Sequence, residues 1–319
     1  MKKIFKAVTV ILLSFFLLLT VLNPDKYVNS ALDGIKLWAL VVLPALLPFF
    51  FITALLSKLG LTDFLAKTLK KPCAKLFRSG GYCAYVFCMS VLSGYPVGAK
   101  IIADLSKNGL VGQDEATRLS CLCSTSGPLF IVGSVGYGMF HDKNVGFCII
   151  IAHVLSAVFC GLLFRFYGKD NPNKNFLLNK TAVGNVLYDC VYSSVISVLI
   201  VGGFICVFST FITAFKSVNF FLPITALFKN LIPKDLLSAF LYGFIECTTG
   251  CKMLALCDLS TYSVAFTSAL ISLGGLSVWA QSIAFLSSAN VNVKVFCLSK
   301  TVQAVIAFLL SLILFPLFV

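Results

Sequence analysis

Charged side chains are scarce in this sequence. Only 12% of its 319 residues are charged, whereas 59% are hydrophobic and the mean hydropathy is +0.98. A soluble domain carries about a quarter charged residues, which it needs to cover its surface. The shortage excludes a water-soluble protein and predicts an all-α, multi-pass membrane protein.

Acidic residues and catalytic motifs are scarcer still. Twelve Asp and Glu stand against 25 Lys and Arg, and there are two histidines. The 13 cysteines form no Cys-x-x-Cys pair, and no phosphate loop, nucleophile elbow or metal-protease motif occurs. The sequence therefore predicts no enzyme, no metal site and no cofactor, and its cysteines are expected to be buried apolar residues. Because cytoplasmic loops of membrane proteins collect Lys and Arg, the net charge of +13 does not indicate a nucleic-acid partner.

Seven stretches are apolar over a length that spans a bilayer. They are residues 4–22, 35–57, 116–140, 145–167, 188–215, 262–288 and 295–318. The first follows three lysines, like a signal peptide, but no small-x-small cleavage site precedes the turn after it. We interpret it as the first transmembrane helix.

Two further apolar stretches, 82–105 and 236–257, are interrupted by helix breakers. Ser93–Gly98 interrupts the first, and Cys247–Gly250 the second. A half-helix of 11 residues is about 16 Å long and reaches half of a ~30 Å hydrocarbon core. Each stretch therefore predicts a re-entrant helical hairpin.

Charge placement supports re-entrant hairpins. The loop 58–81 is rich in basic residues, and so is the loop after Phe164. Both should be cytoplasmic, yet three apolar stretches separate them, so one stretch must enter and leave by the same face. The basic residues of the second loop are Arg165, Lys169, Lys174 and Lys180. The predicted topology has the N-terminus inside, seven crossings and the C-terminus outside.

An internal repeat organises the chain. Gly98–Ala103 resembles Gly250–Ala255, 152 residues later, and each hairpin precedes a span broken at its centre and then an unbroken span. The first hairpin enters from the cytoplasm and the second from outside, so the repeats are inverted, which is typical of secondary transporters. We divide the chain into an N-terminal region 1–81, a first repeat 82–181, and 182–319, which holds the connecting span 188–215 and the second repeat.

Lys100 and Lys252 occupy matching positions near the start of the second helix of each hairpin. A cation there is opposed by the helix dipole and by desolvation, so it favours a nearby anion. One interpretation is an anion-binding cradle between the hairpin tips, formed by both lysines and free backbone N–H groups. Two alternatives stay open: Lys100 reaches the headgroups from the end of a continuous span, or the lysines pair internally with Asp104 and Glu246.

Other polar residues complete the candidate site. Glu246 is an intramembrane carboxylate, interpreted as a counter-ion to Lys252 or as a proton or Na⁺ site; solvation at a shallower tip is its alternative. Serine and threonine also serve as packing residues between membrane helices, and His153 is expected to be a hydrogen-bonded packing residue. The candidate substrate-binding residues are Ser93, Gly94, Tyr95, Gly98, Lys100, Thr125, Ser126, Glu246, Thr248, Thr249, Gly250, Lys252, Ser277 and Gln281.

The string Leu92–Lys100 (LSGYPVGAK), followed by Ser126–Ile131, resembles the YlbJ-type sporulation integral membrane protein family. Gly274–Val278 and Gln281 fit the same family, and the resemblance covers the chain from about residue 30 to the end. The family belongs to the nucleoside-recognition, or Gate, superfamily, which is similar in layout to concentrative nucleoside transporters. The resemblance implies a role in endospore formation, in a membrane around the forespore, with movement of dipicolinic acid as the transport function.

The leading hypothesis is therefore a secondary transporter of a small organic anion, coupled to H⁺ or Na⁺. A non-transporting sporulation assembly protein is one alternative, and a nucleoside or cation transporter of the Gate superfamily is another. Expected partners are the anionic substrate and membrane lipids; a homo-oligomer and sporulation membrane partners stay open.

Overall fold

The computed structural model describes residues 2–169 and 186–318, and within these ranges every regular element is a helix. Four helices are long and apolar enough to cross a membrane, and a bent pair brings the number to five. These findings confirm an all-α multi-pass membrane protein, while the layout of seven spans and two re-entrant hairpins stays a prediction. The predicted repeat boundary at 181 and the basic Lys174 and Lys180 lie outside the described residues.

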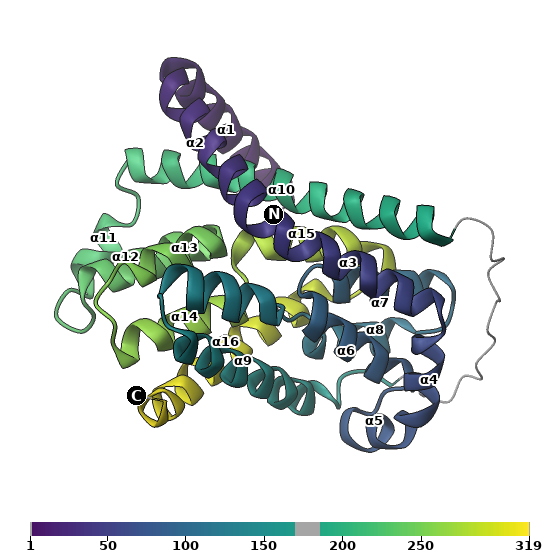
Figure 1. Cartoon of the computed structure of the whole chain (residues 1–319). Coiled ribbons are helices and arrows are strands. Elements are labelled where there is room, and N and C mark those ends of the chain that lie inside the picture. The colour runs from purple at the N-terminus through teal and green to yellow at the C-terminus, as the bar shows by residue number, and fades with distance from the viewer. Residues whose placement is uncertain (1, 170–185, 319) are drawn as a thin grey trace.

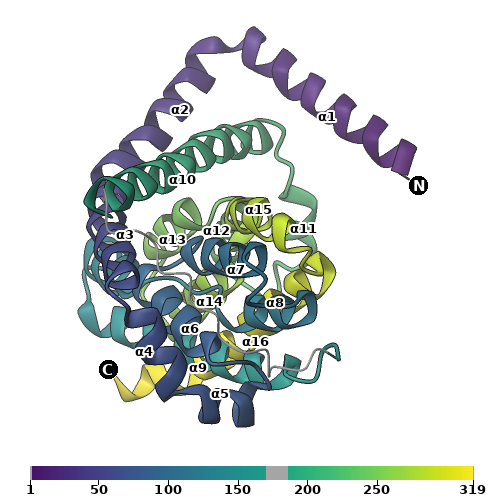
Figure 2. The same ribbon diagram turned by 90° about the vertical axis from the view of Figure 1, so that its right-hand side faces the viewer.

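The N-terminal region is a chain of helices in which proline and glycine set the corners. Pro24 stands at the first position of its helix, where its missing N–H costs nothing. Between Pro24–Val42 and Leu46–Leu56 the apolar helix bends by 52°, next to a π-helical turn. The elements are α1 (Lys2–Leu22), α2 (Pro24–Leu37), η1 (Trp38–Val42), α3 (Leu43–Lys58), α4 (Leu61–Thr68) and α5 (Lys70–Phe77). Helix α1 projects from the body (Figure 2).

The first repeat contains a hairpin, a broken helix and a long helix, in the predicted order. The hairpin helices end and begin at Ser93 and Val97, and the broken helix is interrupted after Leu122. The elements are α6 (Tyr82–Ser93), α7 (Val97–Lys107), α8 (Gln113–Leu122), the π-helical η2 (Leu129–Met139) and α9 (Lys143–Phe164).

The second repeat follows the same order after the 32-residue helix α10 (Val186–Ser217) and the short α11 (Leu222–Leu227). Gly274 breaks its second span, with a φ of 82°. The elements are α12 (Lys234–Ile245), α13 (Cys247–Ala255), α14 (Thr261–Leu273), α15 (Gly275–Leu286), η3 (Ser287–Ala289), α16 (Val293–Leu314) and η4 (Phe315–Leu317). The predicted break at 247–250 is wrong in extent, because Glu246 alone is non-helical and its side chain caps the helix that follows.

The two repeats share their cores. One cluster of buried apolar residues joins η2 and α9 to α12, α13 and α14, and another joins α6 and α7 to the end of α15 and the start of α16. Helix α14 packs against both α9 and α16. Helix α10 and the bent pair α2–α3 run along the outside of this body (Figures 1 and 2). Each helix break therefore lies beside an element of the other repeat.

Candidate functional site

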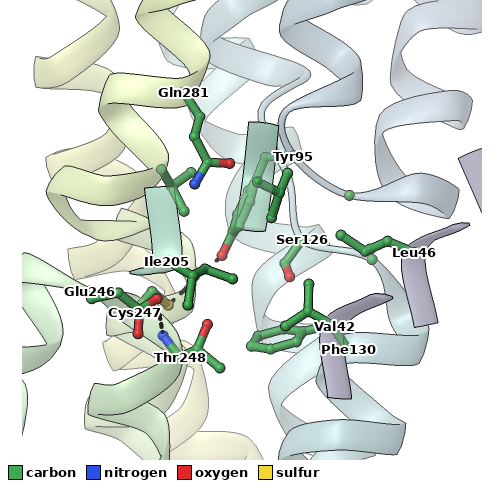
Figure 3. Close-up of a pocket in the computed structure, with 14 residues that line it drawn as sticks. Val42, Leu46, Tyr95, Ser126, Phe130, Ile205, Glu246, Cys247, Thr248 and Gln281 are labelled. Carbon is green, nitrogen blue, oxygen red and sulfur yellow. Dashed lines mark hydrogen bonds between the residues drawn. The ribbon is translucent and has the colours of Figure 1, made fainter. Parts of the chain in front are cut away.

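The cavity that we call the central cavity lies where the two hairpin tips meet the two broken helices (Figure 3). Its volume is about 50 Å³, which is enough for a few water molecules. The lining residues are Val42, Leu46, Gly94, Tyr95, Ser126, Gly127, Phe130, Val201, Ile205, Glu246, Cys247, Thr248, Val278 and Gln281. Six of these were predicted as site residues: Gly94, Tyr95, Ser126, Glu246, Thr248 and Gln281.

The cavity has an apolar wall and a polar wall. Val42 and Leu46 of the bent pair and Val201 and Ile205 of α10 form the apolar wall. The hairpin tips and broken helices provide the polar one, and Figure 3 shows the hydroxyl of Tyr95 and the amide of Gln281 directed inward. Such a site can hold a small polar group against a hydrocarbon face.

Glu246 is the acidic group of the polar wall, and its side chain is only 2% exposed. Its carboxylate accepts hydrogen bonds from the backbone N–H groups of Thr248 (2.9 Å) and Thr249 (2.6 Å). These bonds cap α13, and the positive end of the helix dipole favours the negative charge. The burial of this carboxylate is therefore compensated by the helix that it starts.

Tyr95 connects the two repeats across the cavity. It stands at the tip of the first hairpin, and its hydroxyl donates to the carbonyl oxygen of Ile271 at 3.3 Å. Ile271 belongs to the last turn of α14, and because the helix breaks at Gly274 its carbonyl group lies where the regular helical hydrogen bonds end. The first hairpin thus satisfies an acceptor in the second broken helix.

The tip of the first hairpin packs directly against the break between α8 and η2. The hydroxyl of Ser90 donates to the carbonyl of Cys123 and lies 2.9 Å from Oγ1 of Thr125. Gly94 has a φ of 79°, and a Cβ atom there would lie 2.6 Å from the backbone nitrogen of Gly127. Only glycine permits this approach, so the hairpin tip and the break form one unit.

His153 of α9 bridges the two broken helices. Its ring is fully buried; Nε2 accepts from the backbone N–H of Ser126 at 2.9 Å, and Nδ1 lies 2.8 Å from the hydroxyl of Ser272. Because a neutral imidazole has one donor and one acceptor, Nδ1 carries the proton and donates to Ser272. The prediction of a hydrogen-bonded packing residue is confirmed.

Lys300 is a functional candidate that the sequence analysis missed. The residue is 2% exposed, and its ammonium group donates to the carbonyl of Ser124 (2.8 Å) and to Oε1 of Gln303 (2.6 Å). The carbonyl is just past the C-terminal end of α8, where the helix dipole favours a cation. A lysine inside the apolar span 295–318 was the signal, because an intramembrane cation needs such partners.

Lys100 lies outside the central cavity. It lines a second cavity of about 300 Å³, the Lys100 cavity, together with Lys58, Asp104 and Asp189. Its ammonium group donates to the hydroxyl of Ser197 in α10 at 3.1 Å. Two cations and two carboxylates therefore share this cavity.

Lys252 and Thr249 line a third cavity of about 500 Å³, the Lys252 cavity. Lys36 of α2 and Lys216 of α10 line it as well, and Asp33 is an acidic member of its wall. The structure does not bring Lys100 and Lys252 together, so two separate lysine-lined cavities replace the single anion-binding cradle that was one interpretation of the sequence. Glu246 faces the central cavity and does not share the Lys252 cavity.

Helix α10 passes all three cavities. Ser197 lines the Lys100 cavity, Val201 and Ile205 line the central cavity, and Ser209 and Thr213 line the Lys252 cavity. The three cavities therefore follow one another along a single helix.

The remaining predicted residues do not line the central cavity but lie in the elements around it. Gly98 leaves room for the carbonyl of Cys123, and Gly250 lets the two helices of the second hairpin touch. Ser277 accepts a hydrogen bond from Nε2 of Gln281 at 3.3 Å. The buried hydroxyl of Ser93 has no hydrogen-bond partner among the described residues.

The chain is similar to a protein of known name. It is 31% identical to the Sporulation integral membrane protein YlbJ of Bacillus subtilis (strain 168) over 329 aligned positions, which cover 94% of this chain and 81% of that protein. No family model and no solved structure matches, so membership of the Gate superfamily stays a prediction. The identity, its coverage and the apolar helices agree, and the chain belongs to the YlbJ family of sporulation integral membrane proteins.

Proposed function

We propose that this protein is a secondary transporter of a small organic anion, with dipicolinic acid in endospore formation as its substrate. The observation that carries the proposal is the central cavity, because the hairpin tips and broken helices of both repeats meet there. Paired discontinuous helices from two repeats are the usual construction of a transporter site. Transport requires no covalent chemistry, which agrees with a sequence lacking catalytic motifs.

The sizes of the cavities support alternating access. The central cavity of about 50 Å³ is below the range of roughly 300–1,000 Å³ of sites that bind drug-sized ligands. Larger cavities border α10 on either side of it. In the proposed cycle, the central cavity expands when a hairpin moves, and the substrate reaches it from one of the larger cavities.

In the proposed cycle, Glu246 is the binding site of the coupling ion. An ionised carboxylate in the wall repels a dianion, since charges that are buried together interact strongly. A proton or Na⁺ bound at Glu246 removes this repulsion, so anion and cation cross together. Dipicolinate itself is proposed from the resemblance to sporulation proteins and from the lysines that line the two flanking cavities.

A cation is the second candidate substrate. Among the described lining residues of the central cavity, Glu246 is the charged one, and Tyr95 and Gln281 add neutral oxygen atoms. Carboxylate, hydroxyl and amide oxygens suit a small cation without any anion.

Uptake into proteoliposomes tests the proposal. The purified protein should accumulate labelled dipicolinate, and not uridine, when an inward proton or Na⁺ gradient is imposed. Glu246→Gln keeps one oxygen to cap α13 but loses the charge, so gradient-driven accumulation should stop. Asp258→Asn, on an exposed carboxylate, is the matched control. Absence of dipicolinate uptake under either gradient would contradict the proposed substrate; normal accumulation by Glu246→Gln would contradict the proposed coupling.

A further inference from the structure

The Lys252 cavity carries an excess of positive charge. Lys36, Lys216 and Lys252 line it against the single carboxylate of Asp33 among the described lining residues. The Lys100 cavity, by contrast, has two lysines and two aspartates. Only one of the two large cavities is therefore electrostatically selective for an anion.

Three elements that are distant in the sequence bring these lysines together. Lys36 comes from α2, Lys216 from α10 and Lys252 from α13. Ser30 fixes α2 to α10, because its hydroxyl donates to the carbonyl of Ser209 (3.0 Å) and lies 2.7 Å from Oγ1 of Thr213. The ammonium of Lys216 lies 5.2 Å from the centre of the Tyr242 ring, which holds it over the second hairpin.

Membrane topology does not account for this cluster. Lysines in cytoplasmic loops orient a chain, but the predicted topology places none of these three in such a loop: Lys216 is predicted outside, Lys36 begins a span and Lys252 lies in the second hairpin. They face a cavity whose wall also has the hydroxyl-bearing Ser30, Thr213 and Thr249. Ammonium and hydroxyl groups around a cavity of about 500 Å³ are suited to a carboxylate or phosphate dianion.

We propose that the Lys252 cavity is the binding site where an organic dianion is loaded before it enters the central cavity. The inference rests on the proposed transport function and adds the place where the substrate first binds. Thr248 lines the central cavity and Thr249 lines the Lys252 cavity, so the first turn of α13 borders both cavities. Because this turn lies between the two cavities, we favour a soluble dianion as the occupant over the phosphate of a lipid headgroup, which has the same charge chemistry.

Binding measurements separate this site from transport. The full chain, reconstituted in nanodiscs of phosphatidylcholine, is titrated with labelled dipicolinate, and with picolinate as the monocarboxylate comparison. Dipicolinate should bind more tightly than picolinate. Lys36→Gln, Lys216→Gln and Lys252→Gln should each weaken dipicolinate binding roughly tenfold, the equivalent of one charge-assisted hydrogen bond. Lys229→Gln, on an exposed lysine that does not line the cavity, is the matched control and should bind normally.

Two results would overturn the proposal. One is unchanged dipicolinate binding in all three cavity variants. The other is loss of wild-type binding in nanodiscs that contain phosphatidylglycerol, because a lipid headgroup would then be the occupant. Lysine-dependent binding in a protein that shows no uptake supports the loading site and counts against the transport proposal alone.

Discussion

Replacement of His153 by alanine tests whether the two broken helices depend on one side chain. The imidazole accepts from the N–H of Ser126 at 2.9 Å and donates to the hydroxyl of Ser272 at 2.8 Å. Both groups are buried and belong to different repeats. Alanine leaves both without this partner and creates a cavity in place of the ring.

The expected loss of stability follows from these contacts. A buried polar group left unsatisfied costs about 1–3 kcal/mol, so two such groups cost roughly 2–6 kcal/mol before the cavity is counted. At roughly 2–4 °C per kcal/mol, a loss near the middle of that range lowers the unfolding temperature by about 10 °C.

Thermal unfolding in detergent, followed by tryptophan fluorescence, measures the effect. The indole of Trp279 donates to the carbonyl of Leu273 at 2.6 Å, so its emission reports on the second break. His141→Asn is the control, because His141 is exposed and its φ of 55° is tolerated by asparagine.

A double-mutant cycle with Ser272→Ala isolates the bridge. Residues in direct contact show coupling energies of about 0.5–3 kcal/mol, whereas independent residues add. The reasoning is refuted if His153→Ala unfolds at the same temperature as His141→Asn, or if the two substitutions at the bridge are additive.

Three further predictions concern the same region. Gln303→Leu should destabilise the protein by about 1.5–3 kcal/mol, since the buried ammonium of Lys300 loses an acceptor. Adding Lys300→Met should recover part of this loss in the same thermal unfolding assay, because the uncompensated charge of Lys300 is gone. Tyr95→Phe should lower the unfolding temperature slightly, because one hydrogen bond of about 1 kcal/mol is lost, and it should reduce dipicolinate uptake. Unaltered uptake would show that the hydrogen bond between Tyr95 and Ile271 is dispensable for transport. Gly250→Ala should reduce the yield of folded protein on size-exclusion chromatography, because its Cβ overlaps the backbone of α12, while Gly203→Ala, where the space is open, should not; equal yields would contradict the close helix contact.

Helix breaks could be predicted from the sequence because the backbone conformations of glycine and proline determine where a helix ends. Gly94 and Pro96 end the first helix of one hairpin, and Gly274 adopts a positive φ at the break of the second broken helix. The extent of the second hairpin turn could not be predicted from the sequence, because it depends on the direction of the Glu246 side chain. Once its carboxylate caps α13, the polar residues after it become helical.

The predicted inverted repeat accounts for the separation of Lys100 and Lys252. In an inverted repeat, equivalent residues are related by an axis in the membrane plane, so they lie toward opposite faces. Matching sequence positions therefore predict two equivalent places and not one shared place. The role of Lys300 could not be predicted for another reason: Gln303 is on the same helix, but the carbonyl of Ser124 reaches Lys300 only when α16 packs beside the first break.

The composition of α10 along its length has a consequence for ion leakage in the proposed transport cycle. Serine and threonine face both flanking cavities, whereas Val201 and Ile205 pack with Val42 and Leu46 in the apolar wall of the central cavity. A narrow hydrophobic constriction dewets and so blocks the passage of hydrated ions. In the proposed transport cycle, this apolar wall keeps hydrated ions from following the substrate when a hairpin moves aside, so the membrane potential is retained.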